Sequence, residues 1–441
     1  MEQQHFESLY PEAAHFDDIE KIVGFIKEGN SCQLLGLPGS GRSTLLNLLA
    51  YNRKVRLKHF GAKYQEYHFV MINFSEIRKR PLIDVMKFLF LNLTESLRER
   101  RMLIENKAVG DIFREHLKFQ DELILFQGFK EAIDYLCLEK NITVVFLFDR
   151  FEEYIPTVTD EFFANFRTLR NRAKYKFSVV FSVYHPLEVV LETNLLSDFY
   201  EFVAEHLIFL KLSDSEIMNF RIAYVEKITG KKITKDIKKH ILELTGGSGR
   251  LTKLAIEAVL ANGEKTKDLS KFLLDQKNFH SALLEIWSIL TPAEQADLLT
   301  GKYDDTEVAN YLEQVGLLKD KKITIPLLAT LIKEEFSLRT EKEVMAYDEN
   351  TNSIRKGTDI LSDDLTASEF KLLRYFLQQE GKIVERNELI NVVWEGNKST
   401  AGITDQAVDQ LIFRLRRKIE TDANNPQHLQ TVKGRGFRFI P

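Results

Sequence analysis

Apolar residues in the first half of the chain gather in short runs separated by amphipathic stretches. The runs lie at Gln33–Leu35, His68–Phe74, Ile142–Phe148 and Phe177–Tyr184. Continuous apolar runs of this length are typical of parallel strands buried on both faces. Because helical spacing of apolar positions fills the stretches between them, the pattern predicts an α/β fold with a doubly wound parallel sheet.

After the last of these runs, the apolar spacing becomes helical, and it changes again near residues 276 and 344. Residues 291–294 read Thr-Pro-Ala-Glu, a helix start with a capping box, and a short strand is expected at Ile323–Ile325. We therefore predict a multidomain α/β and α protein. Its segments are an NTPase-like core at 1–212, a helical lid at 213–275, a winged-helix-like domain at 276–340 and a second winged helix at 344–441.

The last hundred residues combine short strands, three helices and a final hairpin. Thr366 and Glu369 form a capping box that opens the first helix. The third helix, from about Thr404 to Ile419, buries one apolar stripe: Val408, Leu411, Ile412, Leu415 and Ile419. Leu429–Phe439 predicts a hairpin with a Gly-Arg-Gly tip.

Composition narrows the class of protein. The 441 residues are 44% hydrophobic and 29% charged with a net charge of −4, which is typical of folded domains. The 32 phenylalanines indicate aromatic cores rather than a surface on which bases stack. Cys32 and Cys137 lack metal-ligand spacing and favour a reducing compartment. No secretion signal and no apolar run long enough to span a membrane occur, so we expect a cytoplasmic protein.

A glycine-rich turn follows the first expected strand. It reads Gly-Leu-Pro-Gly-Ser-Gly-Arg-Ser over 36–43 and matches the phosphate-loop pattern except that Arg42 replaces lysine. Glycines leave room for backbone N–H groups to surround phosphate oxygens, and the following helix adds its positive end. The candidate nucleotide-binding residues of this turn are Gly36, Pro38, Gly39, Ser40, Gly41, Arg42, Ser43 and Thr44.

Asp149 ends the most apolar of the expected strands. An acidic residue at such a strand end holds Mg²⁺ in P-loop proteins, and Ser43 is the matching hydroxyl ligand. Glu152 and Glu153 follow closely, and either could orient a water molecule. Together with Asp149 they are the candidate catalytic residues. A strand that merely ends in a charged turn is the alternative.

Residues 8–270 resemble the P-loop ATPases of the STAND and ORC/Cdc6-like AAA+ group. The resemblance includes Leu244–Lys253, which is similar to a turn in the lid of that group and implies ATP or ADP with Mg²⁺ as cofactor. Within that turn, Arg250 either reaches the terminal phosphate or caps a helix. Members that hydrolyse ATP usually carry lysine and glutamate where this chain has Arg42 and Arg150. We therefore expect nucleotide binding with weak or absent hydrolysis.

The two expected winged helices differ in the sign of their charge. Between residues 280 and 320 there are eight acidic residues and only two basic ones, Lys302 and Lys319. A surface of this charge repels phosphate, so this domain should pack against protein rather than DNA. From residue 396 onward eight basic residues exceed four acidic ones. This surplus on the last helix and hairpin is the expected footprint of DNA binding.

Residues 344–441 are similar to the OmpR/PhoB-type effector domain of bacterial response regulators. The similarity rests on Leu365–Leu373, on Ala407–Glu420 and on Thr431–Phe439. Gln and Arg side chains read major-groove base edges or bind phosphate, and an arginine at a hairpin tip suits a minor groove. Phe413 departs from the polar residue that the family often has. The candidate DNA contacts are Thr404, Gln406, Gln410, Arg414, Arg416, Arg417, Lys433, Arg435 and Arg438.

Together these features predict a bacterial transcription regulator. Its winged helix would bind double-stranded DNA as a dimer or larger assembly under control of a nucleotide switch. An unknown protein or ligand signal would form part of that control. One alternative is an active DNA-dependent ATPase in replication, mobile-element or phage-defence remodelling, anchored by the winged helix. A degenerate ATPase fold that serves only as an oligomerisation scaffold is the other.

Overall fold

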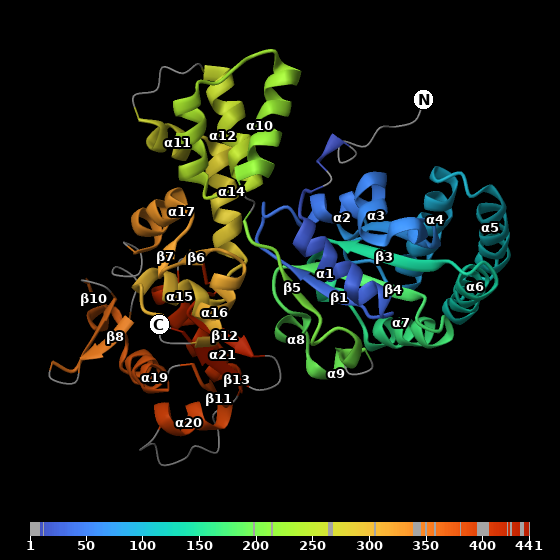
Figure 1. Ribbon diagram of the computed structural model, residues 1–441. Coiled ribbons are helices and arrows are strands. Elements are labelled where there is room, and N and C mark those ends of the chain that lie inside the picture. Colours follow the sequence, from blue (N-terminus) through green and yellow to red (C-terminus); the bar gives the residue numbers. More distant parts are fainter. Residues whose placement is uncertain are drawn as a thin grey trace. The chain divides into compact units, whose positions relative to one another are not determined.

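The computed structural model describes residues 9–11, 13–196, 199–212, 215–262, 268–303, 306–337, 345–348, 351–356, 359–379, 381–394, 405–420, 422–423, 426–432 and 436–440. Contacts divide the chain into two compact units, residues 1–329 and 330–441 (Figure 1). The finer division into four segments stays a prediction, because the first unit includes nearly all of the first three.

A five-stranded parallel sheet forms the centre of the larger unit, in the order β2-β3-β4-β1-β5. The strands are β1 (Cys32–Leu35), β2 (Tyr67–Asn73), β3 (Thr143–Asp149), β4 (Phe177–Val183) and β5 (Leu207–Phe209). Four of them confirm the apolar runs and the doubly wound sheet. The sequence did not predict β5, because its three residues are too few to form a recognisable run.

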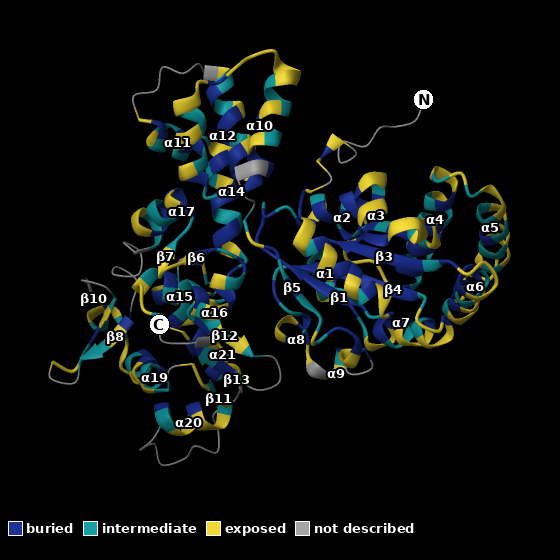
Figure 2. Cartoon of the chain, viewed as in Figure 1, coloured by how far each residue is buried: buried dark blue, intermediate teal, exposed yellow. Residues whose placement is uncertain are grey.

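Alternate residues of each strand face opposite layers of helices, so the sheet is buried on both sides (Figure 2). In β3, Phe146 and Phe148 face one layer, whereas Val145 and Leu147 face the other. The first layer contains α4 (Leu82–Glu99), α5 (Leu103–Leu117), α6 (Glu122–Asp134) and α7 (Asp160–Arg172). The second contains α1 (Phe16–Lys27), α2 (Arg42–Tyr51) and α3 (Arg53–Phe60).

Phenylalanine rings fill the core on the α4–α7 side, as the composition predicted. The Phe151 ring is fully buried, with its centroid 5.0 Å from that of Phe181 and 5.9 Å from that of Phe148. Phe151 directly follows the end of β3, so these contacts fix the turn that leaves the strand. That turn carries Arg150.

Helices follow the sheet in the larger unit. They are α8 (Leu187–Val190), α9 (Thr193–Leu196), α10 (Ser215–Thr229), α11 (Lys235–Thr245), α12 (Gly249–Asn262), α13 (Leu269–Leu274), α14 (Lys277–Ser288), α15 (Pro292–Thr300), α16 (Thr306–Gln314) and α17 (Pro326–Leu331). The capping box at Thr291 and Glu294 is confirmed. The expected strand at Ile323–Ile325 is shorter: β6 (Leu318–Lys319) pairs with β7 (Lys322–Ile323), and Ile325 is buried just before α17.

In the smaller unit, the described residues form two antiparallel sheets and the helices α19, α20 and α21 around one core. Its elements are β8 (Met345–Asp348), β9 (Ser353–Lys356), β10 (Asp359–Ile360), α19 (Ala367–Gln378), β11 (Ile383–Val384), α20 (Arg386–Trp394), α21 (Asp405–Ile419), β12 (Leu429–Val432) and β13 (Gly436–Phe439). The capping box at Thr366 and Glu369 is confirmed, as is the terminal hairpin of β12 and β13. All five residues of the predicted apolar stripe of α21 are buried.

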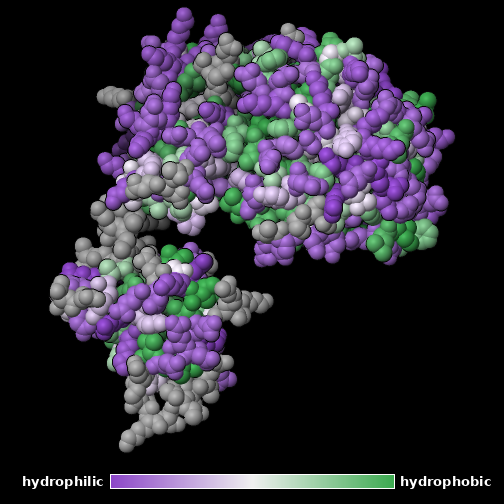
Figure 3. All heavy atoms as spheres, turned by 60° about the horizontal axis from the view of Figure 1, so that its bottom comes forward, coloured by the Kyte–Doolittle hydropathy of each residue, from purple (hydrophilic) through white to green (hydrophobic). Residues whose placement is uncertain are grey.

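None of the helices in the described part of the chain combines the length and the apolar character that a bilayer crossing requires. The face drawn in Figure 3 is mainly hydrophilic and is interrupted by separate hydrophobic patches.

Candidate functional site

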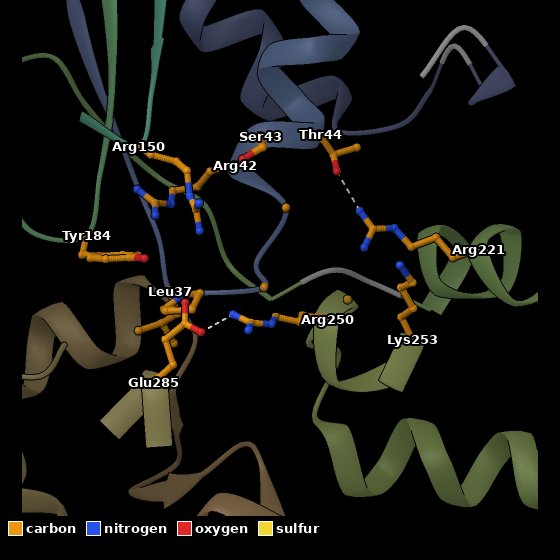
Figure 4. A pocket seen from close by; sticks show the side chains of 14 residues that line it. Leu37, Arg42, Ser43, Thr44, Arg150, Tyr184, Arg221, Arg250, Lys253 and Glu285 are labelled. Carbon is orange, nitrogen blue, oxygen red and sulfur yellow. Dashed lines mark hydrogen bonds and ion pairs between the residues drawn. The ribbon is translucent and has the colours of Figure 1, made fainter. Parts of the chain in front are cut away.

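The carboxyl ends of three neighbouring strands carry the predicted nucleotide site. The glycine-rich turn leaves β1, Asp149 ends β3 and is followed by Arg150, and Tyr184 follows β4. A cavity of about 280 Å³, here named the basic cavity, lies between this edge and helices α10, α12 and α14 (Figure 4). Its lining is Leu37, Pro38, Gly39, Gly41, Arg42, Ser43, Thr44, Arg150, Tyr184, Arg221, Gly249, Arg250, Lys253 and Glu285.

Backbone conformation in the turn requires glycine at two positions. Gly39 and Gly41 have φ of 86° and 107°, which side chains disfavour. A Cβ on Gly39 would also lie 2.7 Å from Ser248 Oγ, and the Gly39 carbonyl accepts a 2.8 Å hydrogen bond from Gly249 N. Helix α2 begins at Arg42, so its first N–H groups face the turn without helical partners. This arrangement suits the binding of an anion.

Ser43 and Asp149, the predicted Mg²⁺ ligands, are in contact. The Ser43 hydroxyl donates a 2.9 Å hydrogen bond to Asp149 Oδ1. Burial raises the pKa of the Asp149 carboxyl, and the Ser43 hydrogen bond and the charge of Arg42 oppose that shift. Mg²⁺ prefers oxygen donors such as hydroxyls and carboxylates. Ser43 at the start of α2 and Asp149 at the end of β3 therefore fit the ion.

Arg42 faces Glu152 as well as the cavity. Its guanidinium donates from Nη2 to Glu152 Oε1 at 2.9 Å and from Nη1 to Oε2 at 3.5 Å. It also lies 4.3 Å from the ring centroid of Tyr184, whose pKa burial raises to about 12. The loop's basic residue is therefore buried and paired, with 8% of its surface exposed.

The other candidate carboxylates, Glu152 and Glu153, pair with arginines and do not line the basic cavity. Glu153 accepts a 2.8 Å hydrogen bond from Arg78, and Glu152 is engaged by Arg42. Neither they nor Asp149 belong to the described residues that line the basic cavity. Gly36 and Ser40 belong to the turn but not to the described residues that line the basic cavity, and a Cβ on Gly36 would meet Ser40 Oγ at 2.7 Å. Their predicted roles stay predictions.

Side chains from the helices after the sheet close the basic cavity. Arg250 lines it and forms an ion pair with Glu285 of α14. Arg221 of α10 donates to Thr44 Oγ1 at 2.9 Å and to the Tyr10 hydroxyl at 2.8 Å. Sequence reasoning missed Tyr184, Arg221 and Lys253. Only Lys253 gave a signal, because it follows Arg250 by three residues and so shares its helix face.

A second, mainly apolar cavity of about 520 Å³ adjoins the first. The two share Thr44, Arg221, Gly249 and Lys253. The residues that line only this apolar cavity are Tyr10, Tyr224, Val225, Ile228, Thr229, Thr252, Ile256 and Glu257. The combined space therefore has one cationic end and one end lined by aromatic and aliphatic side chains.

In the smaller unit, α21 presents a polar face opposite its buried stripe. Gln406, Gln410, Arg414 and Arg417 are exposed at helical spacing, so they share one side of the helix. Phe413 lies among them with 48% of its surface exposed. This face offers amide and guanidinium groups at the spacing that a DNA groove can meet.

Arg416 and Arg438 instead make contacts within the protein. Arg416 donates from Nε to the Leu429 carbonyl and from Nη2 to Thr431 Oγ1, each at 2.8 Å, and so joins α21 to β12. Arg438 donates a 2.9 Å hydrogen bond to Gln430 within the hairpin. Thr404, Lys433 and Arg435 lie outside the described residues.

Residues 362–439 match the model of the family described as "Transcriptional regulatory protein, C terminal". Protein PetR of Rhodobacter capsulatus is 37% identical over 99 residues, which are 22% of this chain and 41% of PetR. The phosphate regulon transcriptional regulatory protein PhoB of Klebsiella pneumoniae is 32% identical over 99 residues, with the same shares of 22% and 41%. Residues 362–439 are an OmpR/PhoB-type DNA-binding domain. The chain spans less than half the length of these curated relatives.

Two solved structures resemble most of this chain at low sequence identity. The Walker-type ATPase paby2304 of Pyrococcus abyssi shares 13% identity over 76% of this chain and 98% of its own, with a TM-score of 0.48. The Orc1 protein of Aeropyrum pernix, solved in complex with DNA, shares 12% identity over 81% and 94%, with a TM-score of 0.37. The parallel sheet and the glycine-rich turn of this chain themselves identify a P-loop ATPase fold.

Proposed function

We propose that this protein is a DNA-binding transcription regulator whose OmpR/PhoB-type domain is controlled by a nucleotide bound in the larger unit. The observation that carries the proposal is the exposed face of α21, on which Gln406, Gln410, Arg414 and Arg417 lie within a domain of known DNA-binding type. PhoB, a relative of this domain, is named as a transcriptional regulatory protein.

The contacts that we propose follow from side-chain chemistry. Gln406 and Gln410 would read adenine, and Arg414 and Arg417 would bind guanine or phosphate in the major groove. Of the remaining candidates, Arg416 would fix the helix against the hairpin, because it is bonded to β12. Thr404, Lys433, Arg435 and Arg438 stay proposed backbone or minor-groove contacts.

The joined cavities support nucleotide as the controlling ligand. Phosphates suit the basic cavity with its glycine-rich turn, and a flat base suits the apolar cavity beside Tyr10 and Tyr224. Ser43 and Asp149 would hold Mg²⁺, which would neutralise phosphate charge. Slow or absent hydrolysis belongs to the same proposal, because Glu152 is engaged by Arg42 and an arginine follows Asp149.

The decisive experiment measures DNA affinity of the full chain at one salt concentration without nucleotide, with ATP and with ADP, each with Mg²⁺. We expect affinity or stoichiometry to differ among the three conditions, and Ser43→Ala to abolish the difference. Thr168→Ala, an exposed hydroxyl change on α7, should behave like the wild type. Identical DNA binding in all three conditions would contradict nucleotide control and leave the larger unit as a scaffold.

Assembly and location are parts of the same proposal. OmpR/PhoB-type domains on repeated half-sites suit a dimer or larger homo-oligomer, which sedimentation with and without DNA would test. A cytoplasmic location and response to a further protein or ligand signal complete the proposal.

A further inference from the structure

Positive charge in the basic cavity is unevenly neutralised. Three of its five basic side chains have a carboxylate partner: Arg42 has Glu152, Arg250 has Glu285, and Lys253 lies 3.8 Å from Glu257. Within the described residues, Arg150 and Arg221 form no ion pair. The hydrogen bonds of Arg221 go to neutral hydroxyls. Two guanidinium groups that form no ion pair among the described residues therefore face this space, where an anionic ligand would neutralise them.

These two guanidinium groups lie at opposite ends of the basic cavity. Arg221 also lines the apolar cavity, so it stands where the two spaces join. Arg150 lines only the basic cavity and lies on the side of Tyr184 and Arg42, across from Arg221 and Lys253 (Figure 4). A ligand whose apolar group fills the apolar cavity would extend its anionic end from Arg221 toward Arg150.

The backbone of Arg150 is held in an unusual conformation. Its φ of 57° and ψ of 41° lie in the left-handed region, which residues with side chains rarely adopt. The fully buried ring of Phe151 on one side and strand β3 on the other hold the residue in place. Backbone strain that the surrounding core maintains is concentrated at binding sites, which favours a ligand-directed role for this side chain.

We propose that Arg150 binds the terminal phosphate of a nucleoside triphosphate and so lets the site distinguish triphosphate from diphosphate. The inference rests on the proposed binding of nucleotide in this cavity. The planar guanidinium fork matches two phosphate oxygens, and among the described residues Arg150 forms no ion pair that would compete for it. A diphosphate anchored at the Arg221 end lacks the third phosphate and does not reach Arg150. Arg150, which replaces the usual acidic residue, is thus the group that distinguishes triphosphate from diphosphate.

Calorimetric titration of the full chain, with Mg²⁺ and with either ADP or the non-hydrolysable ATP analogue adenylyl imidodiphosphate, tests this inference. We expect the wild type to bind the triphosphate about tenfold more tightly, as one added charge-assisted phosphate contact would give. Arg150→Ala should remove most of that preference while changing ADP affinity less than about twofold. Arg150→Lys should retain part of it. Arg98→Ala, an exposed arginine paired with Glu95 on α4, is the matched control and should change neither affinity.

Three results would overturn the proposal in distinguishable ways. Equal weakening of both nucleotides by Arg150→Ala would make Arg150 a general electrostatic contributor. Unchanged binding of both would remove it from the site. If the wild type binds neither nucleotide while its circular dichroism spectrum is that of a folded protein, the proposed nucleotide control falls as well.

Discussion

The Glu152 carboxylate holds the guanidinium of Arg42 at 2.9 Å between Oε1 and Nη2, so the basic side chain of the phosphate loop is paired within the protein. Both side chains are largely buried, at 8% and 15% exposure. A buried pair of this kind loses much of its value when one partner is removed, because the remaining charge is left without compensation. The pair therefore links the affinity of the loop for anions to the stability of the fold.

Glu152→Gln separates these two effects. Removing the negative charge should raise nucleotide affinity several-fold, because Arg42 becomes available to phosphate, and should lower the free energy of unfolding by about 1–3 kcal/mol. Calorimetric titration and urea unfolding measure the two. The predicted catalytic role of Glu152 gives a different result: there the variant would lose ATP turnover with unchanged affinity. Glu105→Gln on α5 serves as the matched control.

Arg416 and Arg414 should differ in how they affect DNA binding. Arg416→Ala removes two hydrogen bonds to β12 and should lower the stability of the OmpR/PhoB-type domain by about 1–3 kcal/mol. Arg414→Ala should leave stability unchanged and weaken DNA binding, and if Arg414 contacts phosphate it should lower the salt slope by about one. Thermal unfolding and fluorescence anisotropy at several salt concentrations test both. Equal stability of the two variants would contradict the structural assignment of Arg416.

His68 should make the protein less stable in mild acid. Burial, with the nearby charges of Arg100 and Arg56, holds the pKa of His68 well below its ordinary range. The unfolded chain takes up a proton below about pH 6.5 that the folded state refuses, so the stability from this residue is full above that pH and falls as the pH drops toward the folded pKa. We expect a loss of about 2 kcal/mol between pH 7.5 and 5.

His68→Gln removes this titration and should flatten the profile over the same range. Urea unfolding at a series of pH values gives the comparison. The reading of His68 is wrong if the variant and the wild type lose stability in parallel.

The buried carboxylate of Glu294 makes two kinds of contact in the larger unit. Its carboxylate accepts from Thr291 N at 2.8 Å as part of the α15 cap, and both its oxygens lie within 3.1 Å of His185 Nε2. Glu294→Ala should therefore lower the free energy of unfolding by about 2–4 kcal/mol, since a cap and a buried hydrogen bond are lost together. Glu294→Gln should lose less because it keeps an acceptor. Glu313→Ala, an exposed change on α16, should be close to neutral.

Local patterns predicted much of this fold. Four strands of the sheet, both capping boxes and the buried stripe of α21 follow from residues near one another in the chain, where periodicity and hydrogen-bonding chemistry act directly. Strand β5 was missed because a three-residue strand carries no period, and its place beside β1 is decided by pairing across the sheet.

The site was predictable only in part for the same reason. The contact of Ser43 with Asp149 follows from strand ends that meet at one edge of a parallel sheet. The pairing of Arg42 with Glu152, and the arrival of Arg221 at Thr44, join positions 110 and 177 residues apart. Such pairings depend on side-chain geometry in the folded chain, and no spacing in the sequence specifies them.

The hydrogen bond from Gly249 N to the Gly39 carbonyl offers a way to measure the opening of the site by hydrogen exchange. Because this bond joins the turn and the start of α12 backbone to backbone, an opening that separates these two elements breaks it. The amide hydrogen of Gly249 then exchanges with solvent only during those openings. Its exchange rate therefore reports how readily this contact opens, and a ligand that holds the turn against α12 should slow the exchange.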